Sequence, residues 1–148
     1  MPLPLLLLLT TLSAAASTSG AASLSGAHSE LHTYGFPSGL LPSNIKSHSI
    51  NRTSGTFLVE FDATCRITLP PDNYVAWYSK RVTGKIVENK IGKIEGISVR
   101  AFYKWWGITG IKISGEDLVF EVGLVTAKYP KKNFGEVPQC EGGKHSSS

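Results

Sequence analysis

The sequence predicts an all-β domain, an antiparallel β-barrel or barrel-like sandwich of short strands with a short N-terminal helix. From residue 45 onward, apolar residues recur with a period of two, the spacing of side chains on one face of a strand. Glycines separate these runs at regular intervals, and no convincing helical stretch lies between them. These observations favour antiparallel strands over a βαβ arrangement.

The helix is expected at residues 29–34, with Ser29 as its N-cap. Gly35 ends it, and Pro37 prevents its continuation because proline lacks the backbone N–H. The next segment, residues 35–42 (GFPSGLLP), combines two prolines and two glycines with apolar side chains. It predicts a structural plug or lid over one end of the barrel, with a binding lip as the alternative.

The first clear strand spans residues 57–61, where Phe57, Val59 and Phe61 share one face and a turn at 52–55 precedes them. A second alternating run, residues 65–69, stops at two consecutive prolines, which cannot donate to a ladder. Further short strands, rich in β-branched and aromatic residues, are predicted at residues 74–79, 82–87, 90–94, 97–103, 107–113 and 118–122.

Residues 1–22 have the pattern of a signal peptide, an apolar run without a charged side chain that passes into small residues. The apolar run is too short to cross a bilayer, so no transmembrane anchor is expected. Cleavage after Ala16, Ala22 or Ala27 satisfies the small-residue rule. The alternative is a core helix of the mature protein. Residues 23–28, small and polar, predict a flexible lead-in.

The remaining chain divides into one β-barrel-like domain, residues 29–140, and a disordered tail, residues 141–148. The leader assigns the protein to the secretory pathway, either outside the cell in the apoplast or in an endomembrane lumen. Asn51 begins an Asn-Arg-Thr sequon on a predicted turn, which predicts N-glycosylation there.

Only two cysteines occur, Cys65 and Cys140. An even cysteine count in an oxidising compartment predicts a disulfide between them, which would tie the C-terminal segment to the core. The alternative is that Cys65 is simply a small buried strand residue.

The formal net charge is +4 and the pI is near 9.1, with lysines spread mostly singly along the chain. An acidic wall polymer and an anionic membrane are candidate partners, and an ordinary solvated surface is the alternative. Nucleic acid is not expected, because the chain lacks a basic stripe and the leader directs it elsewhere.

Several motifs resemble a known family in their order and spacing across nearly the whole mature domain. They are residues 35–42 (GFPSGLLP), 54–57 (SGTF), Cys65, 105–108 (WWGI), 115–123 (GEDLVFEVG), 129–134 (YPKKNF) and 138–140 (PQC). With these motifs the chain resembles the plant family known as domain of unknown function 538.

The resemblance implies a plant protein with a β-barrel-like fold and usually a signal peptide. The family has been likened to lipid-binding bactericidal/permeability-increasing proteins, and esterase activity on chlorophyll or pectin has been suggested for it. No catalytic motif accompanies these suggestions. Many members have further cysteines just after the position of Cys140, and their absence here leaves Cys65 as its intramolecular partner.

The residues predict no catalytic site, metal site or cofactor. A serine hydrolase needs an activated Ser beside an oriented His, yet no Gly-x-Ser-x-Gly motif occurs. His48 is the one histidine expected within the body of the domain, and we interpret it as a solvated polar residue. Histidines and cysteines never approach the spacing of metal ligands.

Candidate ligand-binding residues are the tryptophans Trp105, Trp106 and Trp77. Adjacent residues of a strand face opposite sides, so Trp105 and Trp106 either divide between core and surface or lie on a loop. An exposed Trp near Lys104 suits a sugar ring or a lipid interface. The alternative is that these side chains fill the barrel.

The sequence therefore favours a secreted, non-catalytic module that binds an apolar or amphipathic, lipid-like ligand. One alternative is a carboxylesterase acting on a cell-wall or pigment ester. Another is a protein-interaction module with a filled core. A large apolar pocket favours the first function, a Ser or Asp beside a His in a cleft favours the second, and a solid interior favours the third.

Overall fold

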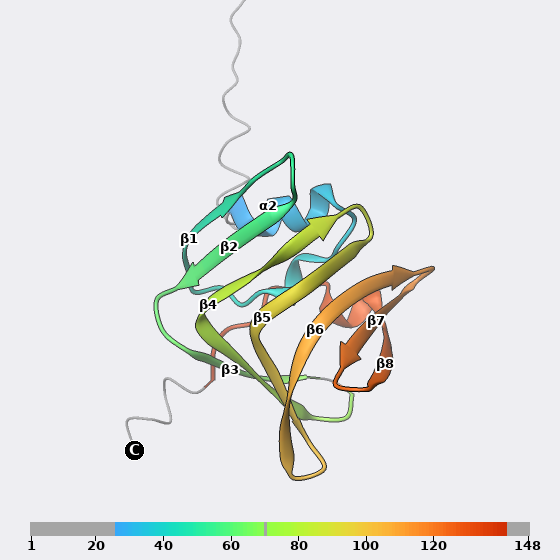
Figure 1. The fold of residues 1–148 in the computed structure, drawn as a ribbon. Coiled ribbons are helices and arrows are strands. Elements are labelled where there is room, and N and C mark those ends of the chain that lie inside the picture. Colours follow the sequence, from blue (N-terminus) through green and yellow to red (C-terminus); the bar gives the residue numbers. More distant parts are fainter. Residues whose placement is uncertain (1–25, 70, 142–148) are drawn as a thin grey trace, which may run out of the picture.

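The computed structural model describes residues 26–69 and 71–141, so the predicted signal peptide lies outside the described residues. Within these described residues, one short α-helix, two 3-10 helices and eight strands follow each other in sequence (Figure 1). They are α2 (Gly26–Thr33), η3 (Ser38–Leu40), β1 (Ile45–Ile50), β2 (Thr56–Phe61), β3 (Cys65–Leu69), β4 (Tyr74–Val87), β5 (Lys90–Ala101), β6 (Lys104–Ser114), β7 (Asp117–Val122), β8 (Val125–Pro130) and η4 (Lys131–Phe134).

The strands form one antiparallel sheet in the order β1-β2-β4-β5-β6-β7-β8, and β3 pairs with the first half of β4. The sheet is open, because β1 and β8 are the two ends of this path. The prediction of an all-β, barrel-like antiparallel fold with a short N-terminal helix is confirmed. Figure 1 shows α2 beside β1 and β2 and the long β5–β6 hairpin at the opposite end of the sheet.

Two strands each join two predicted runs, and β6 begins three residues before its predicted start. β4 joins the predicted runs 74–79 and 82–87, and β5 joins 90–94 to most of 97–103. The register between the two strands shifts between Tyr78 and Thr83, and the buried positions of β5 lose strict alternation, with Ile91, Ile94 and Ile97 three residues apart. Gly96 lies at this bend with φ +108°, and an added Cβ would lie 2.3 Å from the carbonyl oxygen of Arg81. The bulge keeps the ladder intact while bending it, so one strand forms where the pattern indicates two.

The helix begins at Gly26, three residues before its predicted start. Residues 26–28, assigned from the sequence to the flexible lead-in, form its first turn. Ala27 and His28 are buried there, and His28 Nε2 lies 3.1 Å from the carbonyl oxygen of Leu41. The small residues that indicated flexibility therefore allow the helix to pack closely against the core.

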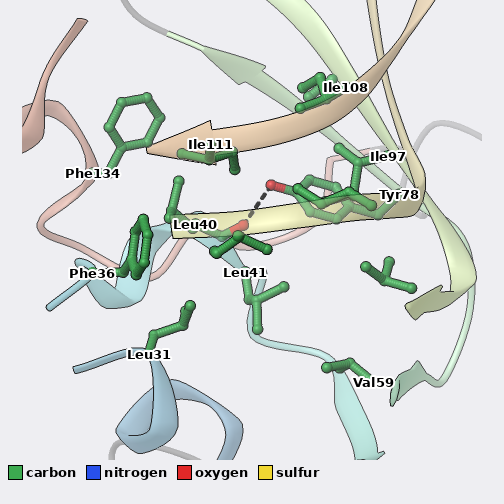
Figure 2. Close-up of a cluster of buried hydrophobic side chains, with 14 of the residues drawn as sticks. Leu31, Phe36, Leu40, Leu41, Val59, Tyr78, Ile97, Ile108, Ile111 and Phe134 are labelled. Atoms are coloured by element: carbon green, nitrogen blue, oxygen red, sulfur yellow. Dashed lines mark hydrogen bonds between the residues drawn. The ribbon is translucent and has the colours of Figure 1, made fainter. Parts of the chain in front are cut away.

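The segment 35–42 fills the interior, which confirms its predicted role as a structural plug. Phe36, Leu40 and Leu41 are all buried, and the Tyr78 hydroxyl donates a 2.7 Å hydrogen bond to the carbonyl oxygen of Leu40 (Figure 2). Buried polar groups of this kind need a partner, and this pair satisfies both members.

Candidate ligand-binding site

A cavity of about 570 Å³ lies against the inner face of the last four strands. The turns β5–β6 and β7–β8 and the β3–β4 loop all lie at the same end of the antiparallel sheet and border it. The lining residues are Leu69, Tyr74, Val99, Ala101, Phe102, Trp106, Ile108, Phe120, Val122, Leu124, Val125, Thr126, Ala127, Tyr129 and Phe134. None of these described residues is charged, and the volume is typical of small-molecule sites, about 300–1,000 Å³.

Aromatic side chains form the floor of this cavity. Phe120 on β7 contacts Phe134 of η4, with ring centroids 5.4 Å apart, and Tyr129 of β8 at 6.2 Å. Phe120 and Phe134 are buried, so they are fixed parts of the core. The cavity is therefore a space between well-packed elements, with a rigid apolar floor.

Trp106 forms part of the cavity wall. Its Nε1 donates a 3.0 Å hydrogen bond to the carbonyl oxygen of Ala101, across the β5–β6 hairpin. Lys104 Nζ lies 4.8 Å from the centroid of its ring. The indole is half-buried, lines the apolar space and is fixed by this hydrogen bond and by the cation over its ring.

Trp105 and Trp77 lie on the opposite, outer face of the sheet. Trp105 pairs with Arg100, whose guanidinium carbon lies 5.9 Å above the indole ring, and its side chain is 43% exposed. Trp77 pairs with Arg66 and Ser98 on neighbouring strands. The structure thus separates the three predicted ligand-binding tryptophans, with only Trp106 lining the cavity.

A hydrogen bond between β8 and the β3–β4 loop lies at the cavity border. The Tyr129 hydroxyl donates to Asp72 Oδ2 at 3.1 Å. Burial and, to a smaller extent, this hydrogen bond raise the pKa of Tyr129 from 10.0 to about 12. The phenol therefore stays protonated, and remains a donor, over the whole neutral range.

A second cavity, of about 60 Å³, lies under α2 and shares no lining residue with the first. His48 and Glu30 lie at its edge, among side chains that are otherwise mainly aliphatic. Glu30 accepts a hydrogen bond from Arg52 on the β1–β2 turn, which joins the helix to the hairpin. This space is too small for a lipid-sized molecule.

The histidines of the described chain lie away from the large cavity. His28 is buried in α2, His32 is exposed on the same helix, and His48 is exposed on β1. No cluster of His, Cys, Asp and Glu in the described ranges could hold a metal ion. His145 lies outside the described residues.

The predicted disulfide is present, with Cys65 and Cys140 joined over 75 residues of sequence. Beyond it, the Glu141 backbone N–H donates to the carbonyl oxygen of Arg66, and the Glu141 carboxylate accepts from the Thr68 backbone N–H and hydroxyl. Glu141 was assigned to the disordered tail, but these bonds order it along the edge of β3. Residues 142–148 lie outside the described residues.

Asn51 is exposed on the β1–β2 turn, as expected. Its Oδ1 accepts hydrogen bonds from the backbone N–H groups of Thr53 and Ser54, at 2.9 and 3.1 Å. This side-chain turn presents the sequon at the surface.

Sequence analysis missed three contributors to the large cavity. β8 was not predicted, since its mostly exposed residues mix polar and apolar types. Phe134 was quoted only as part of a motif, although it forms the floor. Leu124 follows Gly123, and the two apolar residues Leu124 and Val125 directly after a turn glycine were the signal available in the sequence.

The fold and cavity define a small β-sheet protein with one spacious, uncharged pocket at the end of its sheet. The sequence comparison assigns its family: the chain belongs to the family described as "Protein of unknown function, DUF538", whose sequence model matches residues 27–135. No match was found among curated proteins or among solved structures. Within residues 26–69 and 71–141, no helix is long and apolar enough to cross a membrane.

Proposed function

We propose that the protein is a secreted, non-catalytic module that binds an apolar or amphipathic, lipid-like ligand in the cavity at the β5–β8 end of the sheet. The observation that carries this proposal is the composition of the wall, in which about 570 Å³ is lined by described residues without a charge. Burial of apolar surface there is favourable, whereas a charged ligand group would lose its hydration without a partner.

The cavity also suggests how an amphipathic ligand would be oriented. Its apolar part would lie on the floor formed by Phe120 and Phe134. Its polar group would stay at the border, near the Lys104 ammonium group, where water remains accessible. A single-chain fatty acid combines these features and is our first probe.

The compartment proposed is the secretory pathway. The predicted signal peptide, the Cys65–Cys140 disulfide and the exposed sequon at Asn51 support it. Cleavage after Ala27 would remove the start of α2 and a buried side chain, so we expect cleavage after Ala16 or Ala22. N-terminal sequencing and intact mass before and after deglycosylation test this; a product that begins at Met1 would contradict it.

Ligand binding is tested by titrating the purified protein with a fluorescent fatty acid. Ala127→Phe places a ring in the cavity and should abolish binding. Lys128→Phe, at the next residue and on the other face of β8, is the matched control and should bind normally. Thermal unfolding of both variants verifies that they fold. Equal binding by Ala127→Phe and the wild type would refute the proposed site.

A further inference from the structure

Exposed large apolar side chains gather at one end of the molecule. Phe102 and Tyr103 form the β5–β6 turn, with 79% and 95% of their surface exposed, and Leu124 and Val125 at the β7–β8 turn are 102% and 65% exposed. Isolated exposed apolar residues are ordinary, but four such residues at two turns of the same end form an apolar patch, and patches of this kind are typical of interaction surfaces. We refer to these four residues as the apolar rim.

The apolar rim borders the large cavity. Phe102, Leu124 and Val125 belong to its lining, and Tyr103 lies at the end of the same hairpin. Figure 1 shows the β5–β6 hairpin extending beyond the neighbouring strands. Whatever covers the rim therefore also covers the entrance to the cavity.

The backbone of the β5–β6 turn is unfavourable for the residues it contains. Phe102 and Tyr103 have φ values of +52° and +67°, in the left-handed region. Two-residue hairpin turns of this kind prefer Asn and Gly, since bulky residues are strained there. Two aromatic rings in strained turn positions point to a use for the rings themselves.

Cations lie just behind the rim. Arg100 and Lys104 lie within two residues of the turn, over the rings of Trp105 and Trp106 respectively. Asp72 of the β3–β4 loop, at the same end of the sheet, accepts the hydrogen bond of Tyr129. An aromatic end with cations one layer behind it matches a bilayer interface, where apolar groups enter the acyl boundary and anionic headgroups lie above.

We propose that the apolar rim docks on the surface of a lipid bilayer with anionic headgroups, so that the cavity opens directly toward the membrane. This inference rests on the proposed function, because it gives the route by which a lipid-like ligand reaches the cavity. In the docked state an acyl chain passes from the bilayer into the protein without crossing water, which removes the main cost of its transfer.

The test measures sedimentation of the protein with phosphatidylcholine vesicles, with and without phosphatidylglycerol. Tyr103→Asn removes the most exposed ring outside the cavity lining and suits the left-handed backbone. We expect the partition to anionic vesicles to fall by about fivefold or more in Tyr103→Asn. Tyr103→Trp, which keeps an aromatic ring at this position, should partition as the wild type does. Val87→Asn is the matched control, because Val87 is 46% exposed near the β4–β5 turn at the opposite end of β5, and it should partition normally.

Fluorescent fatty acid binding without vesicles separates the two proposals. Tyr103→Asn should bind the free fatty acid as the wild type does, since Tyr103 does not line the cavity. If the wild type binds the fatty acid normally but does not sediment with anionic vesicles, the docking proposal alone is overturned. Vesicle binding without fatty acid binding would overturn the proposed function. An equal loss of vesicle binding in Val87→Asn would also overturn docking by the rim. So would a wild-type protein that is a dimer in solution and that Tyr103→Asn converts to a monomer.

Discussion

The hydroxyl of Tyr129 on β8 donates a hydrogen bond to Asp72 in the β3–β4 loop, and so connects two parts of the sheet that are not neighbours in its strand order. The bond lies at the border of the large cavity, since Tyr129 is one of its lining residues. It thereby closes one side of a sheet that the backbone ladder leaves open.

Burial of the Tyr129 phenol, and to a smaller extent its bond to Asp72, predicts a loss of stability at alkaline pH. The pKa of Tyr129 is raised from 10.0 to about 12 in the folded protein, so between these values the unfolded chain loses a proton that the folded chain keeps. Stability should therefore decrease as pH rises from 10 toward 12. Chemical denaturation across this range should show a smaller decrease in Tyr129→Phe than in the wild type. If the free energy of unfolding falls equally steeply with pH in Tyr129→Phe and in the wild type, the prediction is contradicted.

The separation of the tryptophans predicts which one senses a ligand. A brominated fatty acid in the cavity should quench Trp106, because heavy atoms quench an indole on contact, and should leave the outer-face Trp105 largely unaffected. Trp106→Phe should therefore remove most of the quenching, whereas Trp105→Phe should keep it. Steady-state emission of both variants, titrated in parallel, checks this. A greater loss of quenching in Trp105→Phe than in Trp106→Phe would place the ligand on the outer face of the sheet.

Loss of the disulfide should destabilise the fold. The bond closes a sequence separation of 75 residues, and constraining a loop of this length is worth about 4 kcal/mol in the chain-entropy view. The double variant Cys65→Ser and Cys140→Ser should show a lower denaturation midpoint, and reduced wild type should match it. A midpoint equal to that of the oxidised protein would contradict this.

Gly39 is predicted to tolerate no side chain. A Cβ there would lie 2.2 Å from the carbonyl oxygen of Phe134 and 2.5 Å from that of Glu136, both backbone atoms. Gly39→Ala should therefore push η3 away from η4 and lower stability by about 1–3 kcal/mol, as overpacking does. Urea denaturation measures the loss. Gly107→Ala, where nothing lies within 4 Å of an added Cβ, is the control and should be nearly neutral.

The strand pattern could be predicted from the sequence because burial follows alternation. Phe61 and Ile67 face the core as expected, and Cys65 reaches its partner. The joining of two predicted runs into β4 could not be predicted, since the strand continues through a bulge at which its register with β5 shifts. The predicted strand ending at Tyr103 stops at Ala101 because the chain turns back through the two aromatics.

The candidate site was predicted only in part. Trp106 was identified from the concentration of aromatic residues, and it does line the cavity. Trp105 and Trp77 belonged to the same prediction, yet the pleat turns them outward. Tyr129 and Phe134 also line the cavity, and their approach to Phe120 depends on tertiary packing and leaves no local pattern in the sequence.

Glu141 has a consequence for how the protein behaves with copies of itself. Its backbone and carboxylate occupy the donors and acceptors of Arg66 and Thr68 along the edge of β3. An uncovered strand edge is a template for pairing with another chain. Reduction of the Cys65–Cys140 bond would release the segment that holds Glu141 against β3. A reducing environment should therefore expose the unpaired backbone groups of this edge and promote self-association before the sheet itself unfolds.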